Sequence, residues 1–173
     1  MKRLWMVLVG VLLAGCATLP YASPQATAEL KNAKGDVVGI AALWQVPRGV
    51  RFFADVRGVP PGRHGIHLHA VGKCDPPEFT TAGGHFNPDG KKHGLSSPEG
   101  PHAGDLPNLD VAADGTGQVH YLATKVTLSP GPASLFDADG TAVVVHANAD
   151  DHFTDPTGNS GGRIACGVIQ KAS

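Results

Sequence analysis

The chain has 173 residues and a formal net charge of −1, and its 23 glycines, 14 prolines and 6% aromatic residues favour short strands joined by turns over a helical bundle. This length is typical of one domain with its own hydrophobic core. Beyond residue 15 the basic residues are scattered, and Lys91 and Lys92 are the only adjacent pair. Without a basic stripe, a nucleic-acid partner is not expected.

Residues 1–15 are predicted to be a secretion signal, because Lys2 and Arg3 precede the apolar run LWMVLVGVLL and small residues follow it. A single membrane-spanning helix is the alternative, but the apolar run is well short of the roughly 20 residues that a bilayer requires. The ending LAGC resembles a bacterial lipobox, in which Cys16 becomes the lipid-bearing first residue. We therefore expect an exported, periplasmic or cell-envelope lipoprotein that is anchored to a membrane through Cys16.

Residues 16–25, which are small, polar and contain proline, would then form a tether, and residues 26–173 would form the domain. With Cys16 assigned to lipid, Cys74 and Cys166 remain, and an oxidising compartment would allow them to form one disulfide. On a chain-entropy estimate this bridge would contribute about 4 kcal/mol of stability. Two separate buried thiols are the alternative.

Strand patterns follow in chain order. ATAELKNAKGDVVGIAALWQV holds two alternating runs around the hairpin signal NAKGD, VRFFADVRGV follows the breaker PRG, and GRHGIHLHAVG is a fourth run. After residues 73–107, which have no clear period, come a second hairpin in LDVAADGTGQVHYLATKVTLS, then TAVVVHANA and GRIACGVIQ. The resulting fold class is all-β, an eight-stranded antiparallel Greek-key β-sandwich or flattened barrel. Its two long loops, residues 73–107 and 150–162, are expected to carry function.

The spacing of the histidines points to metal binding. His67 and His69 lie two apart on a predicted strand, so they share one face while Leu68 points to the core and His64 lies on the opposite face. An isolated pair of this kind is usually a solvated surface feature. Here, however, the irregular segment that follows supplies His85, His93, His102 and Asp105, and His146 ends the apolar run AVVVH.

A bound metal could order such a loop and offset its conformational entropy. His93, His102 and Asp105 with one more histidine would suit tetrahedral zinc, whereas His67, His69 and His146 with another histidine would suit copper. Two four-coordinate sites need eight ligand positions, but the candidates are seven side chains. One of them must serve twice, and His85 is the natural candidate because an imidazolate can bind through both ring nitrogens.

Five motifs, HGIHLHAVGKC, GGHFNPDGKKHG, GPHAGDLPNL, VVVHANADD and GGRIACGVI, make residues 26–170 resemble the copper/zinc superoxide dismutases in their bacterial exported form. The resemblance implies one copper ion and one zinc ion per subunit. It also implies the following residue roles: copper ligands His67, His69, His85 and His146; zinc ligands His85, His93, His102 and Asp105; a disulfide between Cys74 and Cys166; Asp150 hydrogen-bonded to His67 and His93; and Arg163 beside copper.

The activity that the resemblance implies is the disproportionation of superoxide to dioxygen and hydrogen peroxide, with copper cycling between Cu(II) and Cu(I). His85 and Arg163 would take part directly, His85 as the bridge and Arg163 as the docking group for the small anion. A homodimer is compatible with the family. The other histidines have plainer interpretations: His64 as a structural hydrogen-bonding residue, His120 on a solvated strand face, and His152 as a loop residue without an assigned role.

Residues 150–162 contain no lysine, whereas family members often use lysines near the channel, and Asp151 and Asp155 add negative charge instead. Steering of superoxide would then depend on Arg163, on copper and on Lys73, Lys91 or Lys92. Two other functions use the same ligands. A protein that only buffers copper and zinc would need neither the arginine nor the shared histidine, and two-metal hydrolysis normally uses more carboxylates.

Overall fold

The computed structural model describes residues 23–172. The predicted signal, Cys16 and most of the predicted tether lie outside these residues, so the predictions made for them are not addressed by the structure. Within the described part of the chain, no helix is both long and apolar enough to cross a membrane.

One antiparallel sheet of ten strands makes up the fold, in the order β4-β6-β7-β3-β2-β1-β9-β8-β5, with β10 paired to β1. The strands are β1 (Ala26–Asn32), β2 (Val37–Val46), β3 (Gly49–Val56), β4 (Gly62–His64), β5 (Ile66–His69), β6 (Leu109–Val111), β7 (Gly117–Ala123), β8 (Ala142–His146), β9 (Arg163–Val168) and β10 (Gln170–Lys171), and η1 (Thr80–Ala82) is a short 3-10 helix. The all-β class and the antiparallel barrel-like architecture are as predicted.

The eight expected strands correspond to these ten segments, because two of them are divided. Gly65 separates β4 from β5, and Ile169 separates β9 from β10. β4 pairs with β6 while β5 pairs with β8, so one nearly continuous strand joins the two ends of the sheet and closes it. β3 is followed in sequence by β4 but pairs with β7, which is the displaced connection of a Greek key.

The core lies inside the curved sheet and follows the alternation of each strand. On β3, Val50, Phe52, Ala54 and Val56 are fully buried, and the intervening residues point outward. Leu68 of β5 is also fully buried in this core, as predicted from its position between two histidines.

The second predicted hairpin is shorter than expected. β7 ends at Ala123, whereas the alternating pattern continued to Ser129. The segment beyond β7 leaves the β3 ladder. Gln45 Oε1 accepts hydrogen bonds from Thr127 Oγ1 and from Leu128 N, and the backbone of Thr127 pairs with Ala133 and Leu135. Residues 124–141 therefore form a third long connection that the sequence pattern did not indicate.

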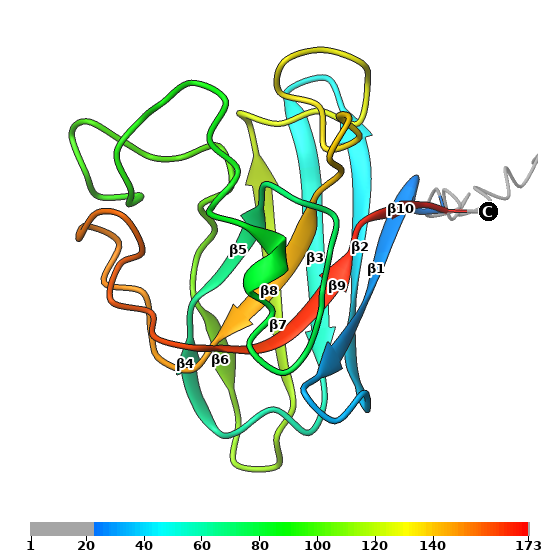
Figure 1. Cartoon of the computed structure of the whole chain (residues 1–173), viewed down its shortest axis with the longest axis vertical. Helices are drawn as coiled ribbons and strands as arrows, with labels where there is room; N and C mark the ends of the chain where they lie inside the picture. The colour runs from blue at the N-terminus through cyan, green and yellow to red at the C-terminus, as the bar shows by residue number, and fades with distance from the viewer. Residues whose placement is uncertain (1–22, 173) are drawn as a thin grey trace, which may run out of the picture.

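The two predicted long loops lie on the same side of the barrel (Figure 1). The first runs from the end of β5 to the start of β6, and the second from the end of β8 to the start of β9. They contact each other where Asp155 Oδ1 accepts a hydrogen bond from His93 N at 2.7 Å and Asp155 Oδ2 lies 3.2 Å from Lys92 Nζ.

Candidate metal centre

β5 places His67 and His69 on the face away from the core. β5 pairs with β8, with His67 opposite Val144 and Ile66 opposite Val145. His146, the next residue and the last of β8, therefore lies at the end of this ladder. All three histidines are at most 3% exposed. Residues far apart in the sequence therefore converge because two strands of fixed register lie side by side.

The first long loop reaches the same place by pairing with the free edge of β5. His69 is bridged to His85 and His67 to Asp105, through backbone hydrogen bonds that include Phe86 N to Leu68 O at 2.8 Å. Gly104 makes this approach possible, since a Cβ there would lie 2.3 Å from Leu68 O. The glycine-rich loop is thus attached to β5, the strand that carries the two candidate ligands His67 and His69.

Four donor atoms in the loop face one another: Nδ1 of His85, His93 and His102, and Oδ1 of Asp105. Four of the six separations between these atoms are 3.0 to 3.4 Å, and all six are within 4.8 Å. A tetrahedron with metal–ligand bonds of 2.0–2.1 Å has edges of about 3.3 Å, so this set fits zinc. His93 Nδ1 has no hydrogen-bond partner, which is the expected state of a metal-facing lone pair.

A second group is formed by His67, His69, His85 and His146. His69 Nδ1 lies 3.0 Å from Gly83 O and His146 Nδ1 lies 3.2 Å from Gly161 O, so each ring carries its proton on Nδ1. Their Nε2 atoms are then both acceptors, and they face each other at 3.3 Å. A bound cation satisfies two such lone pairs, and an all-imidazole set suits copper.

The two groups share His85. Its Nδ1 belongs to the zinc-type set, and its Nε2 is buried without a partner, as is His67 Nδ1 of the copper-type set. The stacked rings of His67 and His85 have centroids 4.0 Å apart. The structure therefore brings all seven predicted ligand side chains into two adjoining groups, with His85 common to both.

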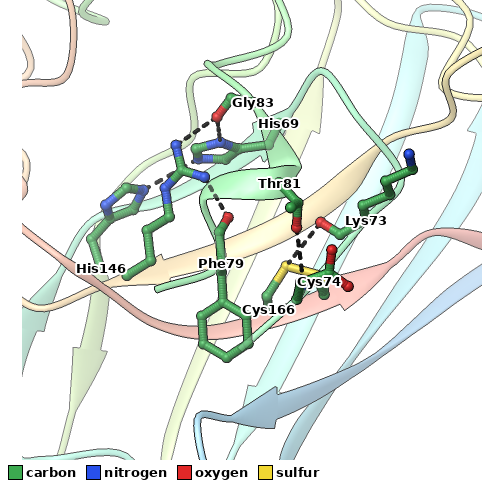
Figure 2. Close-up of a disulfide and its surroundings, with 10 residues drawn as sticks. His69, Lys73, Cys74, Phe79, Thr81, Gly83, His146 and Cys166 are labelled. Carbon is green, nitrogen blue, oxygen red and sulfur yellow. Dashed lines mark hydrogen bonds between the residues drawn. A yellow bond between two sulfur atoms is a disulfide. The ribbon is translucent and has the colours of Figure 1, made fainter. Parts of the chain in front are cut away.

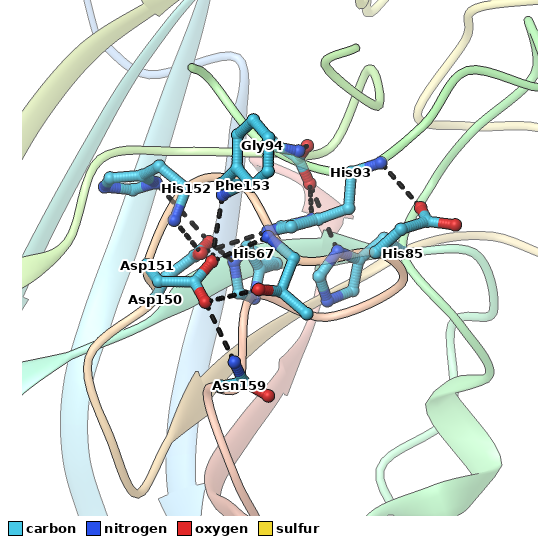
Figure 3. A network of polar contacts seen from close by, with 12 residues as sticks. His67, His85, His93, Gly94, Asp150, Asp151, His152, Phe153 and Asn159 are labelled. Atoms are coloured by element: carbon cyan, nitrogen blue, oxygen red, sulfur yellow. Dashed lines mark hydrogen bonds and ion pairs between the residues drawn. The ribbon is translucent and has the colours of Figure 1, made fainter. Parts of the chain in front are cut away.

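Asp150 links the two groups by hydrogen bonds to the ring nitrogens of His67 and His93 that point away from the candidate metal positions. His67 Nε2 donates to its Oδ2 at 2.7 Å and His93 Nε2 donates to its Oδ1 at 3.0 Å, so both contacts implied by the resemblance are present (Figure 3). These bonds leave the Nδ1 atoms of His67 and His93 free to face a metal. A carboxylate in this position orients ligands of both sets at once.

The electrostatics differ between the two groups. Burial lowers the pKa of His67 to about 4 and of His146 to about 3, and it lowers the pKa of His69 and His85 as well. Burial opposes protonation of His93 too, but the Asp105 carboxylate, 3.0 Å from its Nδ1, and the Asp150 carboxylate, which is hydrogen-bonded to its Nε2, raise its pKa to about 9. Burial therefore favours neutral imidazoles in the copper-type set, whereas the two carboxylates favour protonation of His93 as long as no metal is bound.

Arg163 lies at the edge of the copper-type set. Its guanidinium donates to Phe79 O and Gly83 O, and Gly83 O also accepts from His69 Nδ1. Burial lowers the pKa of this arginine. An open cavity of about 320 Å³ is lined by the following residues: Pro77, Glu78, Thr80, Gly161, Gly162 and Arg163. A small anion in this cavity would meet one cation, Arg163, and one acid, Glu78.

The predicted disulfide is present between Cys74 and Cys166, with a sulfur–sulfur distance of 2.02 Å (Figure 2). It fastens the loop that carries Phe79 and Gly83 to β9, the strand that begins at Arg163. The cystine therefore holds the two carbonyl acceptors near the guanidinium that they bind.

A family model described as copper/zinc superoxide dismutase (SODC) matches residues 37–169. The chain belongs to the copper/zinc superoxide dismutase family. Copper-zinc superoxide dismutase 2 of Aquifex aeolicus is 48% identical over 172 residues, covering 98% of this chain and 100% of that protein. The Caulobacter vibrioides copper-zinc superoxide dismutase is 41% identical over 148 residues, covering 84% of this chain and 85% of that protein. A superoxide dismutase-like protein from Bacillus subtilis has a similar structure, with a TM-score of 0.79 and 40% identity, covering 82% of this chain and 96% of that one.

The remaining histidines have the plain roles predicted for two of them. His64 is buried, with ring nitrogens 2.8 Å from His146 O and 2.8 Å from Pro60 O. His120 is exposed on β7 and its ring packs 4.5 Å from that of Phe53. His152, for which the sequence indicated no role, has its Nε2 3.1 Å from Asn108 Nδ2.

Two residues beside the family's metal centre were missed by the sequence reasoning. A Cβ on Gly158 would lie 1.8 Å from Asp150 Oδ1, so only glycine fits there. Asn108 hydrogen-bonds the backbone of Asp150. The available signals were weak, namely a glycine in a loop rich in glycine and an asparagine inside the motif GPHAGDLPNL.

Proposed function

We propose that this chain is a superoxide dismutase that disproportionates superoxide to dioxygen and hydrogen peroxide. The observation that carries the proposal is the shared imidazole of His85, which presents Nδ1 to one group of metal-type donors and Nε2 to the other. Storage of two metals does not require that they share a ligand, and hydrolysis would need more than the single carboxylate ligand, Asp105.

Copper would be held by His67, His69, His85 and His146, and zinc by His85, His93, His102 and Asp105. When bound, copper supplies a reversible one-electron couple, Cu(II)/Cu(I), and zinc supplies a fixed charge. Two superoxide ions and two protons give one dioxygen and one hydrogen peroxide. We assign one of these protons to His85 Nε2, a buried imidazole atom that has no partner in the described chain.

Arg163 would bind the substrate anion. Its guanidinium is held by two carbonyl oxygens and borders the open cavity, so it is oriented before superoxide arrives. Carbonyl acceptors do not neutralise its charge, and the arginine therefore offers a full positive charge next to the copper-type set.

The test is inhibition of superoxide-driven cytochrome c reduction by the purified protein, with copper and zinc content measured in the same preparation. We expect one copper and one zinc per chain and a rate far above that of an equal concentration of free copper. A fully loaded protein with no more activity than free copper would refute the dismutase and favour the metal-buffering alternative.

We further propose that the protein is exported and anchored to a membrane by a lipid on Cys16, on the evidence of the LAGC sequence after the apolar run. The test compares the wild type with Cys16→Ser by membrane fractionation and mass spectrometry of the N-terminus. We expect a lipid-modified, membrane-bound wild type and an unmodified soluble variant. Equal partitioning of both proteins would refute the anchor. Sedimentation of the soluble variant would also test for the homodimer that the family allows.

A further inference from the structure

Asn108 occupies a fixed position between the core and the metal centre. It directly precedes β6, whose first residue, Leu109, is fully buried and paired with His64. Leu106 is also fully buried. The side chain of Asn108, itself 8% exposed, is therefore held by core residues on both sides and does not depend on a metal for its place.

The amide of Asn108 makes a two-point contact with a single residue. Its Nδ2 donates to Asp150 O at 2.8 Å, and its Oδ1 accepts from Asp150 N at 2.8 Å. The second hydrogen of Nδ2 lies toward His152 Nε2, 3.1 Å away. This pattern copies one step of an antiparallel ladder, with a side chain in the place of a strand, and it requires a donor and an acceptor on one short side chain.

All polar groups of Asp150 thus have hydrogen-bond partners. Its backbone is held by Asn108, one carboxylate oxygen by His67, and the other by His93 and by His152 N at 2.6 Å. Asn108 thus holds the backbone from which the carboxylate reaches both imidazoles. Figure 3 shows Asp150 between His67, His93 and His152.

We propose that Asn108 is a positioning residue, which aligns the Asp150 carboxylate with His67 and His93 and so couples the geometry of the two metal sites. The inference is tested by zinc affinity, which rests on the proposed zinc site, and by exchange of imidazole protons, which does not require the protein to be active. Residues that orient metal ligands typically change affinity or activity by about 10- to 100-fold, and we expect about a tenfold effect from Asn108 because it acts through Asp150.

The structure supplies a matched control. In the same loop, Asn87 makes the same two-point contact with the backbone of Lys91, with Nδ2 to Lys91 O at 2.8 Å and Lys91 N to Oδ1 at 2.9 Å. This pair is exposed, and neither residue is among the hydrogen-bond partners given above for Asp150. Asn87→Ala therefore removes the same kind of loop restraint without touching the carboxylate.

The experiment uses the full protein loaded with zinc and Cu(I), which are both diamagnetic. NMR follows the exchange with water of the Nε2 protons of His67 and His93, with the ring protons of His64 as an internal reference, and chelator competition gives the zinc affinity. We expect Asn108→Ala to speed exchange of both protons at least tenfold and to weaken zinc binding about tenfold, while Asn87→Ala changes neither. Asn108→Asp, which keeps the shape but loses the donor, should resemble Asn108→Ala.

Unchanged exchange and affinity in Asn108→Ala and Asn108→Asp would overturn the proposal, and so would equal losses in Asn87→Ala, because general loosening of the loop would then suffice. If Asn108→Ala does not fold, the isosteric Asn108→Asp alone decides. The proton measurement stands even if the protein fails the dismutase assay, so the two failures can be told apart.

Discussion

Gly158 lies against the carboxylate of Asp150 so closely that a Cβ added to the glycine would be 1.8 Å from Asp150 Oδ1 and 2.7 Å from His93 Nε2. The backbone of Gly158 is also left-handed, with a φ of +62°. No side chain can occupy this position unless Asp150 or His93 moves.

We therefore predict that Gly158→Ala displaces the Asp150 carboxylate, weakens zinc binding by about tenfold or more, and destabilises the fold by roughly 1–3 kcal/mol. Thermal unfolding and zinc titration measure both effects. Gly162→Ala is the control, because a Cβ there would meet nothing within 4 Å. Similar losses in the two variants would show that the close contact is not the cause.

His146 is expected to serve copper alone. His146→Ala should abolish dismutase activity and copper binding while zinc remains bound, because its Nε2 faces His69 and lies outside the zinc-type set. Metal analysis and the cytochrome c assay check this together. His120→Ala, on the exposed face of β7, should leave both unchanged. Loss of zinc instead of copper would mean that the two metals are assigned to the wrong groups.

Glu78 is the one acid among the residues that line the cavity at Arg163. Glu78→Gln should raise kcat/KM for superoxide by about two- to threefold at low salt, and the gain should vanish as ionic strength increases from about 10 to about 200 mM. Pulse radiolysis measures the rate. Glu99→Gln removes the same charge from an exposed site in the other part of the loop, so an equal gain there would indicate a net-charge effect and not a local one.

The metal-free protein should lose stability on acidification. The pKa of His67 falls from 6.5 to about 4 on folding and that of His146 falls to about 3, so their stabilising effect is complete above pH 6.5 and is lost as the pH falls toward 4. His93 behaves oppositely: its pKa is raised to about 9, so its contribution is complete below pH 6.5 and lost as the pH rises through 9. Denaturant midpoints measured at several pH values should therefore peak near neutrality. A midpoint that is constant from pH 4 to pH 7 would contradict the burial of these imidazoles.

The strands could be read from the sequence because they depend on local periodicity. The seven ligand candidates could be read from residue type and spacing, although four of them lie in a segment without a period. The alternation of His67, Leu68 and His69 alone separates a core side chain from two site side chains. The donors of the loop suited zinc, but the second metal and the chemistry came from the family resemblance, since the spacing of histidines specifies neither a redox reaction nor a substrate.

Other features escaped prediction because they depend on contacts between distant segments. Asp155 adds negative charge to a loop without lysine, yet it is paired with Lys92 and accepts a hydrogen bond from His93 N, both in the other loop. Asp151 is likewise occupied, by the backbone of Thr154 and the side chain of Asn159. The segment after β7 is held by contacts with distant residues, namely the side chain of Gln45 on β2 and the backbone of Ala133 and Leu135.

The carbonyl oxygen of Gly83 accepts hydrogen bonds from both His69 and Arg163. The chain then runs back from Gly83 to Cys74, across the cystine to Cys166, and along β9 to Arg163 again. These segments form a closed ring of covalent bonds and one hydrogen bond, so a movement of Gly83, of the disulfide or of Arg163 requires the others to move as well. The disulfide and these hydrogen bonds therefore limit the distance between the imidazole of His69, which we propose binds copper, and the guanidinium of Arg163, which we propose binds superoxide.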